Sequence, residues 1–251
     1  MCLICLCYND EQMKPLRKAG FTIVETMLFL GISGLLVMGV LVGTGTSINI
    51  QRYRDSVTSL KSFLQQQYSE VSNVNNSSTG NACYGDGSTN NPRGQSDCVI
   101  LGRYIISTDG KNLVVKGVIG YIPPDVVLGS NDVEALKKYN IQISPQPSET
   151  YEIEWGSTLA HKNGDTMAFS MLILRSPTSG VIRTFIDNSQ AISDSNIANL
   201  LSIAPSALEN DATICVDSNG LFTGTKLAVY IEKNTTSASG IETLGDNNGC
   251  Q

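Results

Sequence analysis

The residue that most needs a chemical explanation is Glu25, the one charged residue between Phe21 and Gly45. A carboxylate inside an apolar segment costs a few kcal/mol to place in a membrane, so such residues as a rule have a partner and a function. No Lys, Arg or His occurs in the 26 residues that follow Glu25. We therefore expect its partner to come from another molecule, or from a charge that processing of the chain creates.

The segment 21–45 is long enough to cross a bilayer as a helix, which takes about 20 apolar residues. Lys14, Arg17 and Lys18 precede it. By the positive-inside rule, this basic flank places residues 1–20 in the cytoplasm and the chain after Gly45 outside. A cut between Gly20 and Phe21 would create an α-amino group, with a pKa of about 8, close to Glu25.

The run KAGFTIVE over residues 18–25 resembles the class III signal of type IV pilins and pseudopilins. The resemblance implies a leader that ends at Gly20 and a prepilin peptidase that cuts there and methylates the new N-terminus at Phe21. It also implies a role for Glu25 in assembly. The match covers the first part of the mature chain only. Many members of that family carry a proline where this chain has Val42, which Gly39, Gly43 and Gly45 flank.

Two other interpretations of the apolar segment were weighed. A cleaved secretory signal has an apolar region of about 7–15 residues and a small-residue cleavage site, and this segment is longer and contains Glu25. A plain signal anchor fits the length but leaves Glu25 unexplained. Residues 1–12 contain Cys2, Cys5 and Cys7, which is unusual for a leader, and we expect translation to start at Met13.

The apolar pattern predicts an α+β fold with a long N-terminal helix. Apolar residues at helical spacing from Tyr53 to Val74, with no proline between Phe21 and Asn76, predict that the helix continues as an amphipathic segment over 46–76. Residues 77–251 are expected to form one extracytoplasmic head with an antiparallel sheet of about seven strands. Expected strand pairs are 99–107 with 113–121, 167–175 with 181–186, and 212–216 with 226–232, with a further strand at 150–155 and short helices at 131–139 and 194–203.

Four cysteines remain after a cut at Gly20: Cys83, Cys98, Cys215 and Cys250. An even number outside a membrane indicates disulfides, and four cysteines allow three pairings. The local choice pairs Cys83 with Cys98 and Cys215 with Cys250. The second bridge would resemble the C-terminal loop that many pilins close with a disulfide. Free buried thiols are the alternative.

Motifs for catalysis or cofactor binding are absent from the sequence, so we expect neither an enzyme nor a cofactor. The one histidine is His161, in a turn-like run. Asp217-Ser-Asn-Gly220 resembles the opening of a calcium loop, but Lys226 stands where an EF-hand needs a bidentate Glu. We interpret this run and Asp246–Gly249 as turns and predict no metal site.

Charge argues against DNA as a partner. The chain carries −6, and residues 1–20 hold three basic and two acidic residues, a net +1, which leaves −7 for the remainder. DNA binding draws on Lys and Arg that neutralise phosphates. A DNA-capturing minor pilin is therefore an alternative of low rank.

Together these features predict a structural subunit, a minor pilin or pseudopilin, of a type IV pilus-like filament. We expect a single-pass protein of the bacterial inner membrane that later enters a surface pilus or pseudopilus, including those used in secretion or competence. Its expected partners are the lipid bilayer, the prepilin peptidase, an assembly platform and other subunits. The alternative is a membrane-tethered binding or enzymatic domain that does not polymerise.

Overall fold

The structure is a computed structural model, and it describes residues 20–73, 98–123, 125–129, 131–201, 211–220, 224, 226–233, 235–245 and 249–250. The expectations for the leader up to residue 19, for the loop with Cys83 and for residues 246–248 lie outside these ranges. The chain divides into two compact units, Met1–Ser47 and Ile48–Gln251. They are described separately below.

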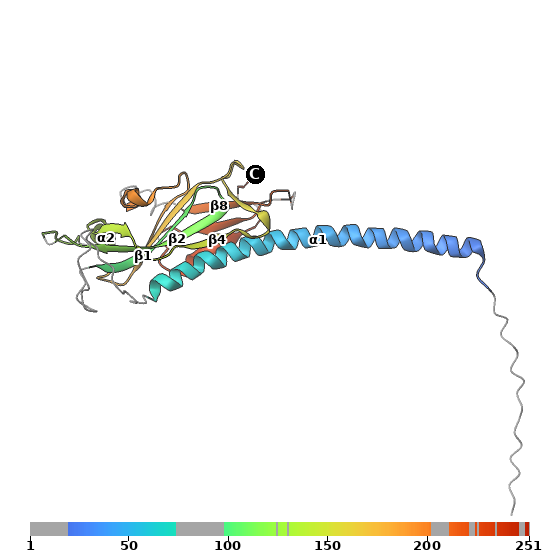
Figure 1. The fold of residues 1–251 in the computed structure, drawn as a ribbon, viewed down its shortest axis with the longest axis horizontal. Helices are drawn as coiled ribbons and strands as arrows, with labels where there is room; N and C mark the ends of the chain where they lie inside the picture. Colours follow the sequence, from blue (N-terminus) through green and yellow to red (C-terminus); the bar gives the residue numbers. More distant parts are fainter. Residues whose placement is uncertain are drawn as a thin grey trace, which may run out of the picture. The chain divides into compact units, whose positions relative to one another are not determined.

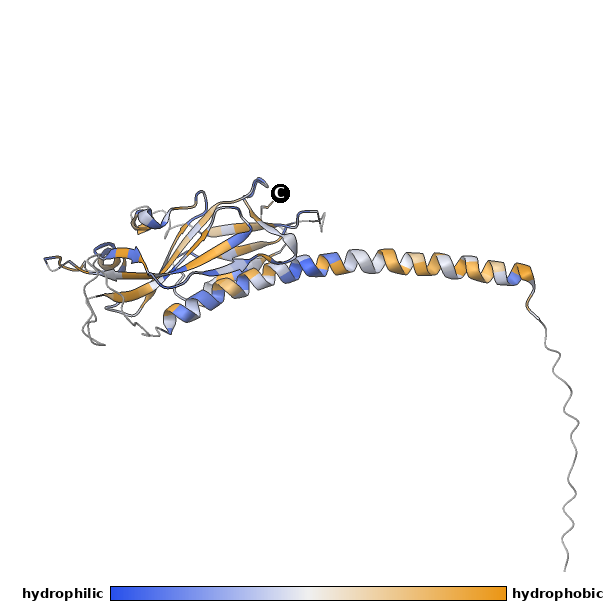
Figure 2. Cartoon of the chain, viewed as in Figure 1, coloured by the Kyte–Doolittle hydropathy of each residue, from blue (hydrophilic) through white to orange (hydrophobic). Residues whose placement is uncertain are grey.

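The first unit contains the N-terminal part of helix α1 (Ile23–Ser72). Its apolar side chains are exposed, from Phe21 at 78% to Val42 at 69%. Figure 2 shows this part of α1 as predominantly hydrophobic. By length and composition the helix could cross a membrane, and within the described residues α1 is the one helix that passes this test.

The second part of α1 belongs to the second unit, and one face of it is buried. The buried face consists of Tyr53, Ser56, Val57, Leu60, Phe63, Leu64, Gln67, Tyr68 and Val71. The amphipathic segment predicted over 46–76 is found as a helix with a buried face from Tyr53 to Val71, and the helix ends at Ser72. Figure 1 shows this part of the helix beside the sheets.

The first sheet is antiparallel and is built around two hairpins that the sequence predicted. Its strands, in spatial order, are β3 (Asn140–Ile143), β2 (Asn112–Tyr121), β1 (Val99–Ser107), β6 (Phe169–Arg175) and β7 (Ile182–Asp187), and β4 (Glu149–Glu152) also pairs with β2. The β1–β2 turn contains Gly110 at φ +68°, and the Asp109 carboxylate accepts hydrogen bonds from the N–H groups of Lys111 and Asn112. Gly102 lies where β1 bulges, and a Cβ there would lie 1.9 Å from the carbonyl oxygen of Ile173.

The second sheet is also antiparallel and has the strand order β10-β9-β8-β5. Its members are β5 (Thr158–Ala160), β8 (Ala212–Asp217), β9 (Ala228–Ile231) and β10 (Ile241–Leu244). The predicted pairing of 212–216 with 226–232 is found as β8 with β9. The expectation of one sheet is wrong, because β5 and β10 pair with β8 and β9 rather than with the first sheet.

Two hydrophobic cores lie on opposite faces of the first sheet. Along β6, Phe169, Met171 and Ile173 enter the core shared with α1 and the second sheet. Leu172 and Leu174 enter the other core, with α2 (Asp132–Lys137) and residues 197–201. A strand buried on both faces is typically an apolar run without alternation, as residues 171–174 of β6 are.

The short elements differ from the predictions in their bounds. Asn131 caps α2 by accepting a hydrogen bond from the Glu134 N–H, as expected of a helix at 131–139, but the helix ends at Lys137. The strand predicted at 150–155 stops at Glu152, because the 3₁₀ turn η1 (Glu154–Gly156) follows it. The helix predicted at 194–203 begins as the 3₁₀ turn η2 (Asp194–Asn196), and the described chain there ends at Leu201. A third 3₁₀ turn, η3 (Ala238–Gly240), leads into β10.

Candidate functional site

Glu25 lies in the first turn of α1, and Thr22 caps this turn, which the sequence analysis did not identify. The side chain of Thr22 accepts a hydrogen bond from the Glu25 N–H at 3.2 Å, and the Thr22 carbonyl accepts from the Thr26 N–H at 3.1 Å. Thr22 is therefore the N-cap and Glu25 the third helical residue, which is the spacing of a capping box. A carboxylate in the first turn also interacts favourably with the helix dipole.

The Glu25 side chain is exposed and makes no ion pair with the residues that the structure describes. Its neighbours along the chain are apolar and equally exposed, including Val24, Leu28 and Phe29. Nothing in the described chain thus neutralises the Glu25 carboxylate. A partner for its charge has to come from elsewhere.

Gly20 and Phe21 precede the helix in exposed, non-helical backbone. The peptide bond between them is therefore accessible, as the predicted cleavage requires. Phe21 and Glu25 lie on either side of the cap residue Thr22, so a new amine at Phe21 would form at the same end of α1 as the carboxylate.

The glycines of the apolar part of α1 make no close contacts. A Cβ added at Gly31, Gly34, Gly39, Gly43 or Gly45 would meet nothing within 4 Å. A glycine inside a helix costs up to about 1 kcal/mol relative to Ala. No contact among the described residues accounts for that cost.

The described cysteines of the second unit, Cys98, Cys215 and Cys250, are in disulfides. Cys215, buried in β8, is joined to Cys250 with Cα atoms 5.8 Å apart, which is the pairing that the sequence analysis chose for these two residues. Cys98 is also disulfide-bonded. Its expected partner, Cys83, lies outside the described residues.

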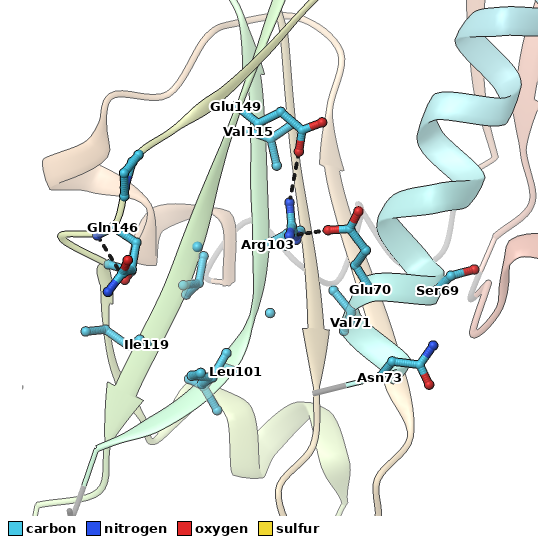
Figure 3. Close-up of a pocket in the computed structure, with 16 residues that line it drawn as sticks. Ser69, Glu70, Val71, Asn73, Leu101, Arg103, Val115, Ile119, Gln146 and Glu149 are labelled. Carbon is cyan, nitrogen blue, oxygen red and sulfur yellow. Dashed lines mark hydrogen bonds and ion pairs between the residues drawn. The ribbon is translucent and has the colours of Figure 1, made fainter. Parts of the chain in front are cut away.

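A groove of about 580 Å³ lies between the C-terminal end of α1, strands β1 and β2, and the segment before β4. Figure 3 shows Arg103 at its centre, with Glu70 on one side and Glu149 on the other. Arg103 forms ion pairs with both carboxylates, and the pair with Glu149 has a distance of 3.3 Å. Arg103 also donates to the side-chain oxygen of Gln67, which is buried.

The charges of this groove favour a structural role over ligand binding. The charged residues of its lining are Glu70, Arg103 and Glu149, so the cation is already paired and the net charge is −1. A phosphate backbone requires unpaired cations, which this lining does not supply. The Arg103 cluster instead ties the end of α1 to β1 and β4, and the sequence offered no signal for it because its members are distant in the chain.

The two motifs weighed for metal or acid–base chemistry are turns in the structure. Asp217 accepts a hydrogen bond from the Asn219 N–H at 2.7 Å and pairs with Lys226 at 2.6 Å. Burial alone would raise the pKa of the Asp217 carboxyl, but these interactions with Lys226 and Asn219 outweigh it and lower the pKa. His161 closes a turn through backbone hydrogen bonds with Asp165 and Gly164.

The described residues contain no group of three His, Cys, Asp or Glu side chains that could hold a metal ion.

No family model, no curated protein and no solved structure matches the chain. The functional argument therefore depends on the residues of this chain alone.

Proposed function

We propose that the chain is a structural subunit of a type IV pilus-like filament, as a minor pilin or pseudopilin. It is inserted in the inner membrane through residues 21–45, with its N-terminus in the cytoplasm and its head outside. A prepilin peptidase cuts after Gly20 and methylates Phe21. An ATPase-driven machine with a membrane platform then extracts the subunit into a helical filament.

The observation that carries this proposal is the exposed apolar part of α1 with an unneutralised Glu25 at its start. In a filament of packed helices, the carboxylate of one subunit can pair with the Phe21 amine of a neighbour. Such a pair is worth more in a low-dielectric bundle than in water. It would set the register of each added subunit.

The glycines of the same segment support helix packing between subunits. Gly31, Gly34 and Gly39 make no close contact in the described chain, while small residues let helices approach closely in membranes and bundles. The disulfide between Cys215 and Cys250 supports an oxidising location for the head.

The second candidate is a membrane-tethered domain that does not polymerise, and the Thr22–Glu25 spacing favours it. Thr22 caps α1, and a Glu three residues later has the capping-box spacing from which its side chain can reach the N–H of the cap residue in any membrane helix, so Glu25 needs no neighbouring subunit on this account. The two candidates therefore differ in whether the negative charge of residue 25 matters, or only its capacity to cap the helix.

The deciding experiment compares Glu25→Gln with Glu25→Ala in cells that carry the filament machinery. Gln preserves the capping box but removes the charge. The filament account predicts that both variants are inserted and cleaved but absent from sheared filaments. Glu242→Gln, an exposed position on β10, is the matched control and is expected to assemble normally. Normal assembly of Glu25→Gln would refute the ion-pair role.

A further inference from the structure

Trp155 is an exposed aromatic residue in a strained backbone conformation. It lies in η1 with φ +57° and ψ +25°, and its side chain is 49% exposed. The left-handed region costs a non-glycine residue about 1–2 kcal/mol. The conformation is held from both sides, since the Ser157 N–H donates to the Glu154 carbonyl and the Asn219 side chain donates to the Gly156 carbonyl. The fold thus maintains, at a cost, an indole that faces solvent.

Arg52 of α1 contacts Trp155, and Ile48 is the neighbour of Arg52 on the same helix face. The guanidinium carbon of Arg52 lies 4.9 Å from the centroid of the Trp155 ring, a cation–π contact. Ile48, which is 48% exposed, precedes Arg52 by four residues and so shares its helix face. Among the described residues of the second unit, the large exposed hydrophobic side chains are Ile48, Val127 and Trp155. Arg52 is thus the neighbour of two of these three side chains, and we call the set of Ile48, Arg52 and Trp155 the Trp155 patch.

The distance along the chain from the apolar segment to this patch is short. Ile48 follows Gly45 by three residues and Arg52 follows it by seven. At 1.5 Å per residue this is about 5 Å and about 10 Å of helix. The headgroup layer on each side of a bilayer is about 5–8 Å thick. If Gly45 lies at the edge of the hydrocarbon core, Ile48 lies within the headgroup layer. Arg52 then lies just beyond that layer, with its side chain tilted back toward the N-terminus of the helix and so toward the headgroups.

We propose that the Trp155 patch is a membrane-interface anchor that docks the head on the headgroup layer of the bilayer. The inference rests on the membrane-spanning part of the proposed function, and not on filament assembly. Trp is enriched at membrane interfaces because its ring is apolar and its N–H is polar. Arg52 places its charge at lipid phosphates, and the indole beside it lies in the headgroup layer.

Local charges are compatible with a bilayer of zwitterionic lipid. The exposed side chains next to the patch include Arg54 and Asp55 on α1 and Glu154 on η1. The Glu154 carboxylate accepts a hydrogen bond from the Ser59 hydroxyl at 3.0 Å, and Tyr151 donates to the same hydroxyl. These contacts hold the acidic group on the side of the helix away from Gly45, because Ser59 lies two turns beyond Arg52.

The experiment uses the natural tryptophan, since the sequence contains one Trp. The full chain is reconstituted in phosphatidylcholine vesicles whose acyl chains carry bromine near the headgroup end, and in vesicles without bromine. We expect the bromine to quench Trp155 fluorescence and the membrane to protect the indole from iodide in the buffer. Arg52→Gln should weaken both effects.

The matched control moves the tryptophan to the other end of the head. The double variant Trp155→Phe/Val127→Trp places it after Tyr121, whereas Trp155 lies near the Asn112 end of β2, which pairs with Glu152. The ten residues of β2 separate the two ends by about 30 Å. Val127 is 86% exposed, so iodide and not bromine should quench this variant.

Membrane integration is measured separately by resistance to alkaline extraction. An integrated chain whose Trp155 is quenched by iodide and not by bromine overturns the anchor while leaving the proposed function intact. Equal bromine quenching of the Val127→Trp control also overturns it, because the head would then lie on lipid without a specific contact. A chain that alkali extracts overturns both the membrane span and the anchor.

Discussion

Helix α1 contains two regions with opposite relations between apolar side chains and solvent. Over residues 23–42 the apolar side chains occur on all sides and are exposed, with Leu36 at 65%. From Tyr53 to Val71 they form one stripe, and Leu64 is fully buried. A helix with one apolar face packs on its own domain, whereas one that is apolar all round needs a lipid or protein environment. The comparison indicates that no described part of the chain covers the first region.

The sharpest test of this comparison makes the same substitution in each region. Leu64→Ala removes a fully buried side chain and should lower the free energy of unfolding of the head by about 2–5 kcal/mol. Leu36→Ala should leave it unchanged, because Leu36 contacts solvent or lipid rather than the head core. Denaturant titrations of the full chain in detergent, followed by Trp155 fluorescence, give both values. Equal losses for the two variants would contradict the division of α1 into two regions.

Removal of the Cys215–Cys250 disulfide should produce the next largest effect. The bridge closes a loop with a sequence separation of 35 residues. Its loss in a Cys215→Ala/Cys250→Ala variant is expected to cost about 2–4 kcal/mol of head stability. The resistance of the chain to alkaline extraction from membranes should not change, because the bridge lies in the second unit alone. If the reduced wild type is as stable as the oxidised protein, the bridge has no stabilising role.

Tyr53 offers a test of a smaller contribution from the buried face of α1. Its hydroxyl donates to the Val216 carbonyl at 2.7 Å and accepts from the Leu227 N–H at 2.6 Å. Tyr53→Phe leaves both groups without this partner and should cost about 1–3 kcal/mol. Tyr139→Phe is the control, since that hydroxyl makes no hydrogen bond to the described residues, and it should be close to neutral. A neutral Tyr53→Phe would show that the hydroxyl does not help to fix α1.

The Tyr53 hydroxyl also predicts how the stability of the head changes at alkaline pH. Burial raises the pKa of Tyr53 above its usual value, and the hydrogen bond from Leu227 offsets only part of that effect. The folded state therefore keeps this proton at pH values where the unfolded chain has lost it. Stability should fall as the pH rises above about 10, the unfolded pKa of tyrosine, and Tyr53→Phe should show a smaller fall.

Low pH should produce the smallest loss of stability among these tests, and this loss should be confined to the second unit. Burial would raise the pKa of the Asp187 carboxyl, but hydrogen bonds from Ser189 and Gln190 outweigh it and lower the pKa. The pKa of Asp217 is lowered for the same kind of reason, because its interactions with Lys226 and Asn219 outweigh the effect of burial. A carboxyl group whose pKa is lower in the folded than in the unfolded state stabilises the fold at pH values above its unfolded pKa. The free energy of unfolding should therefore be level down to about pH 5 and fall below about pH 4. Thermal melts of the wild type and Asp217→Asn measure this, and a stability that rises on acidification would contradict it.

The sequence could predict the parts of the fold that depend on local patterns. The apolar stripe from Tyr53 predicted the second half of α1, and the strand pair 99–107 with 113–121 predicted the first hairpin; both are present. The short strands β3, β5 and β10 have three or four residues each, which gives too few alternations for a pattern. The division into two sheets depends on pairings distant in the chain, such as β5 with β8.

The sites divide in the same way. The charge of Glu25 within an apolar run is visible in the sequence, and so is the Thr22–Glu25 spacing, but the hydrogen bond that makes Thr22 the cap is a feature of the structure. The Arg103 cluster and the Trp155 patch join residues from separate elements. The strain at Trp155 has no sequence signal, because a tryptophan does not favour a positive φ.

The most direct test of the central claim is the N-terminus of the chain recovered from the membranes or filaments of cells with the assembly machinery. Intact-mass analysis and N-terminal sequencing should find a chain that begins at Phe21 with a methylated amine, and Gly20→Ser or a bulkier residue should block this cleavage. A product that still carries residues before Phe21, or that begins at a later residue, would contradict the account.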